Sequence, residues 1–257
     1  MASNKSTKQV NAMVSRAMRV AAVLPSVSRL RPLAAYMLEQ GLLATGLIAG
    51  QLLLAPLTYA GPEGGVVISG QGNVNTISPT HTDINQQSQN LLMNFDSFDV
   101  SSDESVLITQ PNAGAWFVGQ VEGGSPTSIF GSITANGKIA LINTSGVIFG
   151  ENARVNAAGI FASSLGVNAN DIFSGNIELE AAPGSGGYVV NHGLIQASVG
   201  GSVTLLGETV SNSGVIVATL GQVNLTSGNK AVVNFGPEQL IGIEVTEAVL
   251  ENNEGLK

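Results

Sequence analysis

The sequence contains no cysteine among its 257 residues. This absence excludes disulfide bonds, structural zinc held by thiolates and a cysteine nucleophile. Charged residues are also scarce, at 11% of the chain, whereas about 25% is usual in a globular domain. Aromatic residues make up only 5%, while glycine is abundant at 32 residues and 44% of the chain is hydrophobic. A sizeable core with many tight turns is therefore expected.

The few charges are distributed unevenly along the chain. Residues 1–60 contain six basic residues and one acidic residue, whereas residues 61–257 contain four basic and 17 acidic residues. The second part thus has a net charge of −13, which repels phosphate backbones. We therefore expect no binding to nucleic acid.

Short apolar segments alternate with turns between residues 129 and 165. Residues 139–142 (Ile-Ala-Leu-Ile) precede Asn-Thr-Ser-Gly at 143–146, and residues 147–150 (Val-Ile-Phe-Gly) follow. Asparagine and glycine tolerate positive φ, so they suit turns that β-branched residues resist. This pattern predicts short strands and leaves little room for helices.

Two different short sequence motifs recur downstream at nearly the same spacing. Residues 191–195 (Asn-His-Gly-Leu-Ile) return as residues 212–216 (Asn-Ser-Gly-Val-Ile), and residues 201–205 return as residues 221–225. Offsets of 21 and 20 positions suit one coil of a solenoid and are too short for a helical pair or a propeller blade. We predict an all-β, right-handed parallel β-helix, in which Val203 and Leu205 face inward.

Two other folds share part of this pattern. An antiparallel β-sandwich would also contain short strands with alternating polarity, but its strands need not repeat the same sequence motifs. Leucine-rich repeats have a similar period, but the dense leucine spacing that they require is missing here. The sandwich is the second interpretation.

The first 60 residues have the order of a secretory signal. Basic residues precede an apolar stretch at 41–57, which small residues follow, so cleavage between Ala60 and Gly61 is expected. The alternative is an uncleaved membrane anchor, although about 17 residues is near the lower limit for a bilayer span. The absence of cysteine fits export, because no early disulfide would lock the unfolded chain.

An N-terminal β cap is expected over residues 61–100. A first coil with an exposed edge invites aggregation, and this less repetitive region is available to cover it. Phe95, Phe98, Trp116 and Phe117 would then pack over the end of the core.

Residue pairs with catalytic or metal-binding potential are few. His81 and His192 lie in different sequence motifs, and neither has a metal-ligand partner at a suitable spacing. Neither a metal nor a cofactor is therefore predicted. The acid pairs Asp96/Asp99 and Asp103/Glu104 lack a calcium-loop pattern and are interpreted as turn residues. We expect no enzymatic activity, and the alternative is a secreted β-helix enzyme acting on carbohydrate.

Seven segments follow one another in a distinctive order: residues 70–73 (Gly-Gln-Gly-Asn), 84–86 (Ile-Asn-Gln), 94–100 (Asn-Phe-Asp-Ser-Phe-Asp-Val), 110–113 (Gln-Pro-Asn-Ala), 133–138, 141–150 and 159–165. Together they resemble the N-terminal secretion domain of filamentous-haemagglutinin-type proteins, which are exported by two-partner secretion. Residues 110–113 are similar to an Asn-Pro-Asn-Leu-like turn of the family. In the second turn, Thr144-Ser145 replaces Pro-Asn, so φ there is not fixed by a ring.

The resemblance implies an exported passenger. Its N-terminal domain would direct the chain to an outer-membrane β-barrel transporter with periplasmic domains and would start β-helix folding, as part of an adhesin or haemagglutinin. The implied recognition turns comprise Gln110, Pro111, Asn112, Asn143, Thr144, Ser145 and Gly146. A host-cell receptor or glycan is a further implied partner.

The predicted organisation has three parts. Residues 1–60 are a leader, residues 61–247 are the secretion-type β-helix, and residues 248–257 are an acidic tail at which we expect a longer passenger to be cut short. The expected location is the medium or the bacterial surface, reached through the periplasm.

Overall fold

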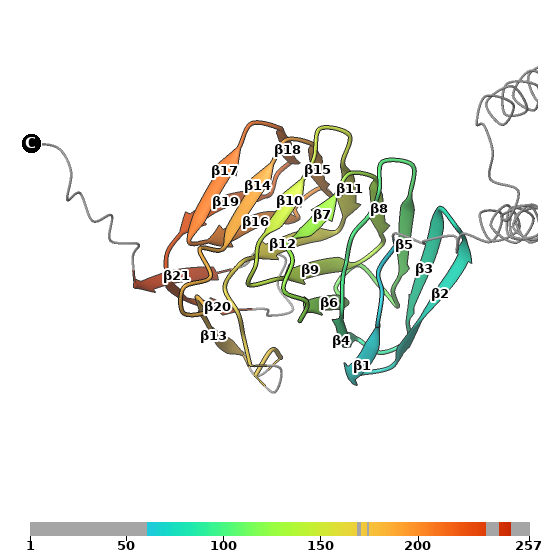
Figure 1. The fold of residues 1–257 in the computed structure, drawn as a ribbon, viewed down its shortest axis with the longest axis horizontal. Helices are drawn as coiled ribbons and strands as arrows, with labels where there is room; N and C mark the ends of the chain where they lie inside the picture. Colours follow the sequence, from blue (N-terminus) through green and yellow to red (C-terminus); the bar gives the residue numbers. More distant parts are fainter. Residues whose placement is uncertain (1–60, 169–170, 174, 235–241, 248–257) are drawn as a thin grey trace, which may run out of the picture. The chain divides into compact units, whose positions relative to one another are not determined.

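The computed structural model describes residues 61–168, 171–173, 175–234 and 242–247, which form 21 strands. The predicted leader, with Ala60, and the predicted tail at 248–257 lie outside the described residues. Among the described residues, no helix is both long enough and apolar enough to cross a membrane. The strands build three stacked sheets of a parallel β-helix and one separate antiparallel sheet (Figure 1).

The central sheet has seven strands. In spatial order they are β1 (Val66–Ser69), β4 (Asn90–Phe95), β6 (Trp116–Val121), β9 (Lys138–Ile142), β12 (Gly159–Ser163), β16 (Ser202–Gly207) and β19 (Gln222–Ser227). All neighbours are parallel except β1, which runs antiparallel to β4.

The lateral sheet also has seven strands. They are β18 (Val215–Ala218), β15 (Leu194–Ala197), β11 (Arg154–Ala157), β8 (Ser132–Ala135), β5 (Ser105–Thr109), β3 (His81–Gln86) and β2 (Gly72–Ser78). Only the terminal β2–β3 pair is antiparallel. The antiparallel β1 and β2 thus lie at the same end of the two long sheets and form the predicted N-terminal cap.

The short sheet completes the later coils. Its four parallel strands are β17 (Thr209–Asn212), β14 (Tyr188–Asn191), β10 (Val147–Phe149) and β7 (Thr127–Ile129). A full coil contributes one strand to each of the three sheets, as the sequence period predicts.

The repeated sequence motifs occupy equivalent positions in successive coils. Asn191 pairs with Asn212, and Val203 pairs with Val223, so the offsets of 21 and 20 residues each correspond to one coil. The recurrent glycines allow close stacking: a Cβ on Gly214 would lie 2.3 Å from the carbonyl oxygen of Gly193, and one on Gly221 would lie 1.8 Å from that of Gly201. Only a residue without a side chain fits these contacts.

The inner core is a column of apolar residues running through the coils. On the central sheet, Phe117, Ile139, Ile160 and Val203 pair in register from strand to strand, and all four belong to one buried cluster. Val203 and Leu205 both face this cluster, which confirms the predicted inward orientation.

A second core covers the outer face of the central sheet. The outer sheet, which consists of β13 (Asn176–Glu180), β20 (Lys230–Asn234) and β21 (Gly242–Glu247), is antiparallel. Its residues Leu179 and Val233 belong to the same buried cluster as Phe161 of β12. Because both faces of the central sheet are covered, every residue of β9, β12 and β16 is buried.

The outer sheet corrects one expectation about the end of the chain. The β-helix was predicted to extend to residue 247, but β20 and β21 leave it: β20 pairs with β13, which is inserted between β12 and β14, and β21 pairs with the other edge of β20. The alternating pattern gave the strands correctly. It carried no information on their partners, because pairing across 58 positions, as between Asn176 and Asn234, depends on the tertiary fold.

The cap contains only three of the four predicted aromatic residues. Phe95 packs edge-on against Phe98 at a centroid distance of 5.0 Å and against Phe117 at 6.3 Å, within the inner core. Trp116 instead belongs to the outer core, where the amine of Lys138 lies 5.2 Å from its ring centroid. Neighbouring residues of a strand face opposite sides, so Trp116 cannot share a face with Phe117.

Lys230 joins the strands of the outer sheet by ion pairs. It contacts Glu178 of β13 directly, and its amine lies 3.9 Å from the carboxylate of Glu180. The hydrogen bond to Glu178 raises the pKa of Lys230 above its ordinary value of 10.5. The folded state therefore holds this proton more tightly than the unfolded chain does. The resulting stabilisation of the fold is present at neutral pH and is lost as the pH rises through the raised pKa.

Truncation of Phe161 should destabilise the domain because its ring fills the interface between the central and outer sheets. We expect Phe161→Ala to lower the free energy of unfolding by about 3–5 kcal/mol. Chemical denaturation followed by circular dichroism measures this value. Val199→Ala, at an exposed turn, is the control and should leave stability nearly unchanged; equal effects of the two substitutions would contradict the second core.

Candidate functional site

The first predicted recognition turn joins β5 to β6. Gln110 is only 4% exposed, and its side chain ties neighbouring coils together. Its Nε2 donates to the carbonyl oxygens of Ala115 and Lys138, each at 3.0 Å, and its Oε1 accepts from the backbone N–H of Gly137 at 2.9 Å. In the folded domain Gln110 is thus a structural residue that satisfies buried backbone groups.

Two further polar residues complete this arrangement. Gln86 occupies the position before Gln110 in the stack: its Oε1 accepts from Gln110 at 3.2 Å, and its Nε2 donates to the carbonyl oxygen of Trp116 at 3.0 Å. Asn136 makes two hydrogen bonds to the backbone of Gln110, at 2.7 and 2.8 Å. Gln86 was not among the predicted residues, although two glutamines at equivalent ends of consecutive coils are a recognisable signal.

The rest of the first turn is accessible. Pro111 and Asn112 are exposed. The Oδ1 of Asn112 accepts from the backbone N–H of Gly114 at 2.9 Å, and its Nδ2 donates to Oε1 of Gln89 at 2.8 Å. The turn is therefore held in one shape while its tip faces solvent.

The second predicted turn joins β9 to β10. Asn143 is buried: its Nδ2 donates to the carbonyl oxygen of Ser125 at 2.9 Å, and its Oδ1 accepts from the backbone N–H of Ser145 at 2.9 Å. Thr144 and Ser145 are half-buried, and Gly146 has a φ of +123°, which side-chain-bearing residues rarely adopt. The asparagine thus fixes the turn that lacks proline.

The two turns do not form one site. The first lies where the lateral sheet passes into the central sheet, and the second lies where the central sheet passes into the short sheet. Of the predicted cleavage pair, only Gly61 is described, at the rim of the pocket below.

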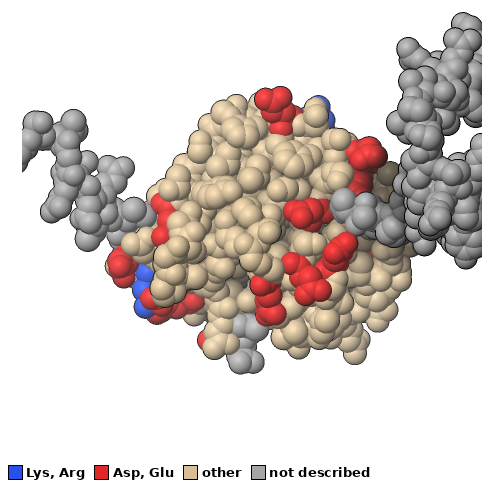
Figure 2. All heavy atoms as spheres, in the orientation of Figure 1, with Lys and Arg blue, Asp and Glu red and all other residues tan. Residues whose placement is uncertain are grey.

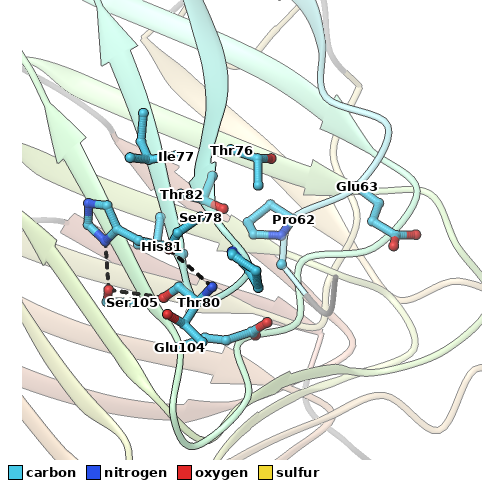
Figure 3. A pocket seen from close by; sticks show the side chains of 13 residues that line it. Pro62, Glu63, Thr76, Ile77, Ser78, Thr80, His81, Thr82, Glu104 and Ser105 are labelled. Carbon is cyan, nitrogen blue, oxygen red and sulfur yellow. Dashed lines mark hydrogen bonds between the residues drawn. The ribbon is translucent and has the colours of Figure 1, made fainter. Parts of the chain in front are cut away.

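A pocket of about 370 Å³ opens beside the cap (Figure 3). His81 lies on its wall, with Nδ1 at 2.7 Å from Oγ of Ser105 and Nε2 at 2.9 Å from Oδ1 of Asp83. The remaining lining combines prolines and threonines with carboxylates: Pro62, Glu63, Thr76, Pro79, Thr80, Thr82 and Glu104. His81 and Ser105 are paired residues of adjacent strands, so this hydrogen bond follows from the register of β3 and β5.

The acid pairs serve the local backbone. Asp99 accepts from the N–H of Ser128 at 2.7 Å, and Glu104 accepts from that of Ser101 at 2.6 Å. In the described part of the chain, no three His, Cys, Asp or Glu residues gather as metal ligands would. Asp99 and Glu104 thus each hold a backbone N–H of a neighbouring turn, and Glu104 is itself buried.

Comparison with known proteins assigns the chain to a family. Residues 60–254 match the family model described as the TPS secretion domain. The chain therefore belongs to the family of secretion domains of two-partner secretion, whose members are exported.

Two kinds of relative support this assignment. A heme/hemopexin-binding protein of Haemophilus influenzae strain Rd is 36% identical over 183 residues, which are 66% of this chain and 20% of that protein. The crystal structure of the HMW1 secretion domain from Haemophilus influenzae superposes with a TM-score of 0.67 at 27% identity, covering 74% of this chain and 50% of that one. The chain thus spans about a fifth of the length of the first relative.

Substitutions at Gln110 and at Asn112 should affect the stability of the fold to different extents. Gln110→Leu leaves the buried N–H of Gly137 without its acceptor and Oε1 of Gln86 without its donor, so we expect a loss of about 2–4 kcal/mol of folding free energy. Asn112→Ser, at the exposed tip, should cost about 0.5 kcal/mol or less. Urea denaturation of both variants tests this difference, and an unchanged midpoint for Gln110→Leu would refute it.

Proposed function

We propose that this domain directs its chain to an outer-membrane β-barrel transporter with periplasmic domains and that its coils begin β-helix folding outside the cell. The observation that carries the proposal is the family match over residues 60–254, which includes all of the described β-helix. Export through the periplasm leads to the medium or the bacterial surface, with the leader cleaved between Ala60 and Gly61.

Recognition would take place on the unfolded chain. Periplasmic domains can bind an extended segment by adding it to a sheet edge, where backbone hydrogen bonds supply affinity and alternate side chains fix the register. We assign the two turns, at 110–112 and 143–146, as the segments recognised. The burial of Gln110 and Asn143 in the folded state favours this order of events, because folding withdraws both side chains from a partner.

Folding outside would bias the movement of the chain. Each coil pairs with the preceding one, so a coil that has folded resists return through the transporter. The last described coil offers a face for further growth: Val223 and Leu225, which continue the inner column, are 45% and 48% exposed. Residues 209–228 of this coil carry no charge that would oppose stacking.

The passenger that this domain exports is proposed to be an adhesin or haemagglutinin that binds a host receptor or glycan. A second candidate follows from the relative named as a heme/hemopexin-binding protein, namely a passenger that captures a haem-carrying host protein. The matched region accounts for 20% of the length of that relative.

Transporter-dependent secretion is the direct test. The full chain is expressed in a Gram-negative host with and without a two-partner transporter encoded beside it, and the medium is analysed by intact mass. We expect a product starting at Gly61 only when the transporter is present. Asn112→Ser combined with Pro111→Ala should reduce its amount severalfold without affecting stability. Periplasmic retention in both hosts would refute the export role.

A proline in the central sheet tests the link between folding and export. β9 pairs with strands on both sides, so Ala140→Pro removes a backbone donor and introduces a clash that costs about 3 kcal/mol or more. We expect slower appearance at the surface in a pulse-chase experiment. Ala140→Gly, which costs about 1 kcal/mol, is the matched control; equal secretion rates for both would show that folding does not drive export.

A further inference from the structure

Strand β1 is an apolar edge without a described partner on one side. It pairs with β4 alone, and all four of its residues are exposed. Val66 is 59% exposed and Ile68 is 45% exposed. Natural edge strands usually carry charges or are covered, because an open apolar edge accepts foreign strands. The composition of β1 is therefore unusual for an edge that stays free.

A groove of about 220 Å³ runs beside this strand. Its lining combines apolar and acidic side chains, and consists of Gly64, Val66, Ile68, Asn94, Phe95, Asp96 and Glu122. Val66 and Ile68 form one wall, whereas the exposed carboxylates of Asp96 and Glu122 lie on the adjoining loops. An occupant must therefore be apolar on one side and able to neutralise negative charge on the other.

Unsatisfied acceptors lie next to the groove. The Oδ1 of Asn94 and the Oε1 of Gln120 are buried and have no hydrogen-bond partner, and the two residues pair in register on β4 and β6. A buried acceptor without a donor is costly. The Nδ2 of Asn94 already donates to Glu122. Two acceptors without a donor thus lie on neighbouring strands here, one of them on Asn94, which lines the groove.

The charge distribution favours a basic partner over a second copy of this chain. The groove lining includes the two carboxylates of Asp96 and Glu122 and no lysine or arginine. Figure 2 shows several Asp and Glu side chains on the face that it displays and very few Lys or Arg. Two copies joined edge to edge at β1 would bring these carboxylates together, whereas a cationic segment would pair with them.

We propose that the folded domain binds, at β1 and its groove, an extended segment of a partner protein in which apolar and basic side chains alternate. The apolar side chains would pack on Val66 and Ile68, and the cationic groups would donate to Asp96 and Glu122. The register shift between Val67 and Ser69 limits backbone pairing to the start of the strand, so side-chain contacts supply most of the affinity.

This interaction is distinct from transporter recognition as proposed above. It needs the folded cap, in which β1 lies against β4, whereas export recognition acts on the unfolded chain. The two proposals can therefore fail separately: secretion reports on one, and binding by purified folded protein reports on the other.

The test uses the purified full chain and a fluorescent ten-residue peptide of alternating valine and lysine. Fluorescence anisotropy measures its affinity, beside a peptide in which glutamate replaces lysine. We expect saturable binding of the basic peptide only, weakened by salt. Asp96→Asn combined with Glu122→Gln should weaken it about tenfold, a factor that corresponds to about 1.4 kcal/mol. Val66→Ser combined with Ile68→Ser should weaken it severalfold.

A matched control separates the groove from general charge attraction. Glu151→Gln combined with Asp171→Asn removes two exposed carboxylates elsewhere and should leave the affinity unchanged. Circular dichroism checks that all variants are folded. Equal weakening by the control pair, equal binding of the acidic peptide or absence of saturable binding would each overturn the proposal.

Discussion

Parallel hydrogen bonding between successive coils is the constraint on which the rest of the structure depends. In-register pairing places the same position of each coil above its predecessor, as in the row of Phe117, Ile139, Ile160 and Val203. The side chain at each position must therefore fit the side chains about 20 positions away, which stack on it, as well as its neighbours in sequence. The stacked glycines at 193 and 214 show the same constraint, because the backbone passes too closely there for a side chain.

The corners of the coils depend on buried amides. Gln86, Gln110 and Asn143 satisfy backbone groups that leave the ladders where the chain turns from one sheet to the next. Asn191 continues this principle in the later coils, where it donates to Asn212 at 2.7 Å. These contacts explain why a domain with so few charges is rich in Asn and Gln: uncharged amides provide donors and acceptors without the cost of burying an ion.

The sequence predicted the β-helix, its period and its inward-facing residues, because these follow from the local alternation of apolar and polar residues and from the repeated sequence motifs. It did not predict the outer sheet, since nothing in the strand at 176–180 specifies pairing with residues 230–234. The two predicted turns are present as turns, with Gln110 and Asn143 buried and Pro111 and Asn112 exposed, whereas their part in recognition stays a prediction. The groove beside β1 was missed because its walls come from three separate segments, at 64–68, 94–96 and 122.

The insertion that carries β13 has a consequence for the timing of assembly. Its antiparallel partner β20, and β21 beyond it, are the last described strands, so Phe161 and Leu206 cannot be fully covered until these two strands are available. In a chain that emerges from its N-terminus, the coils can stack one at a time, but the outer sheet closes only after the final coil. Assembly in sequence order would therefore have two stages: the coils stack first, and the outer sheet closes over the central sheet afterwards.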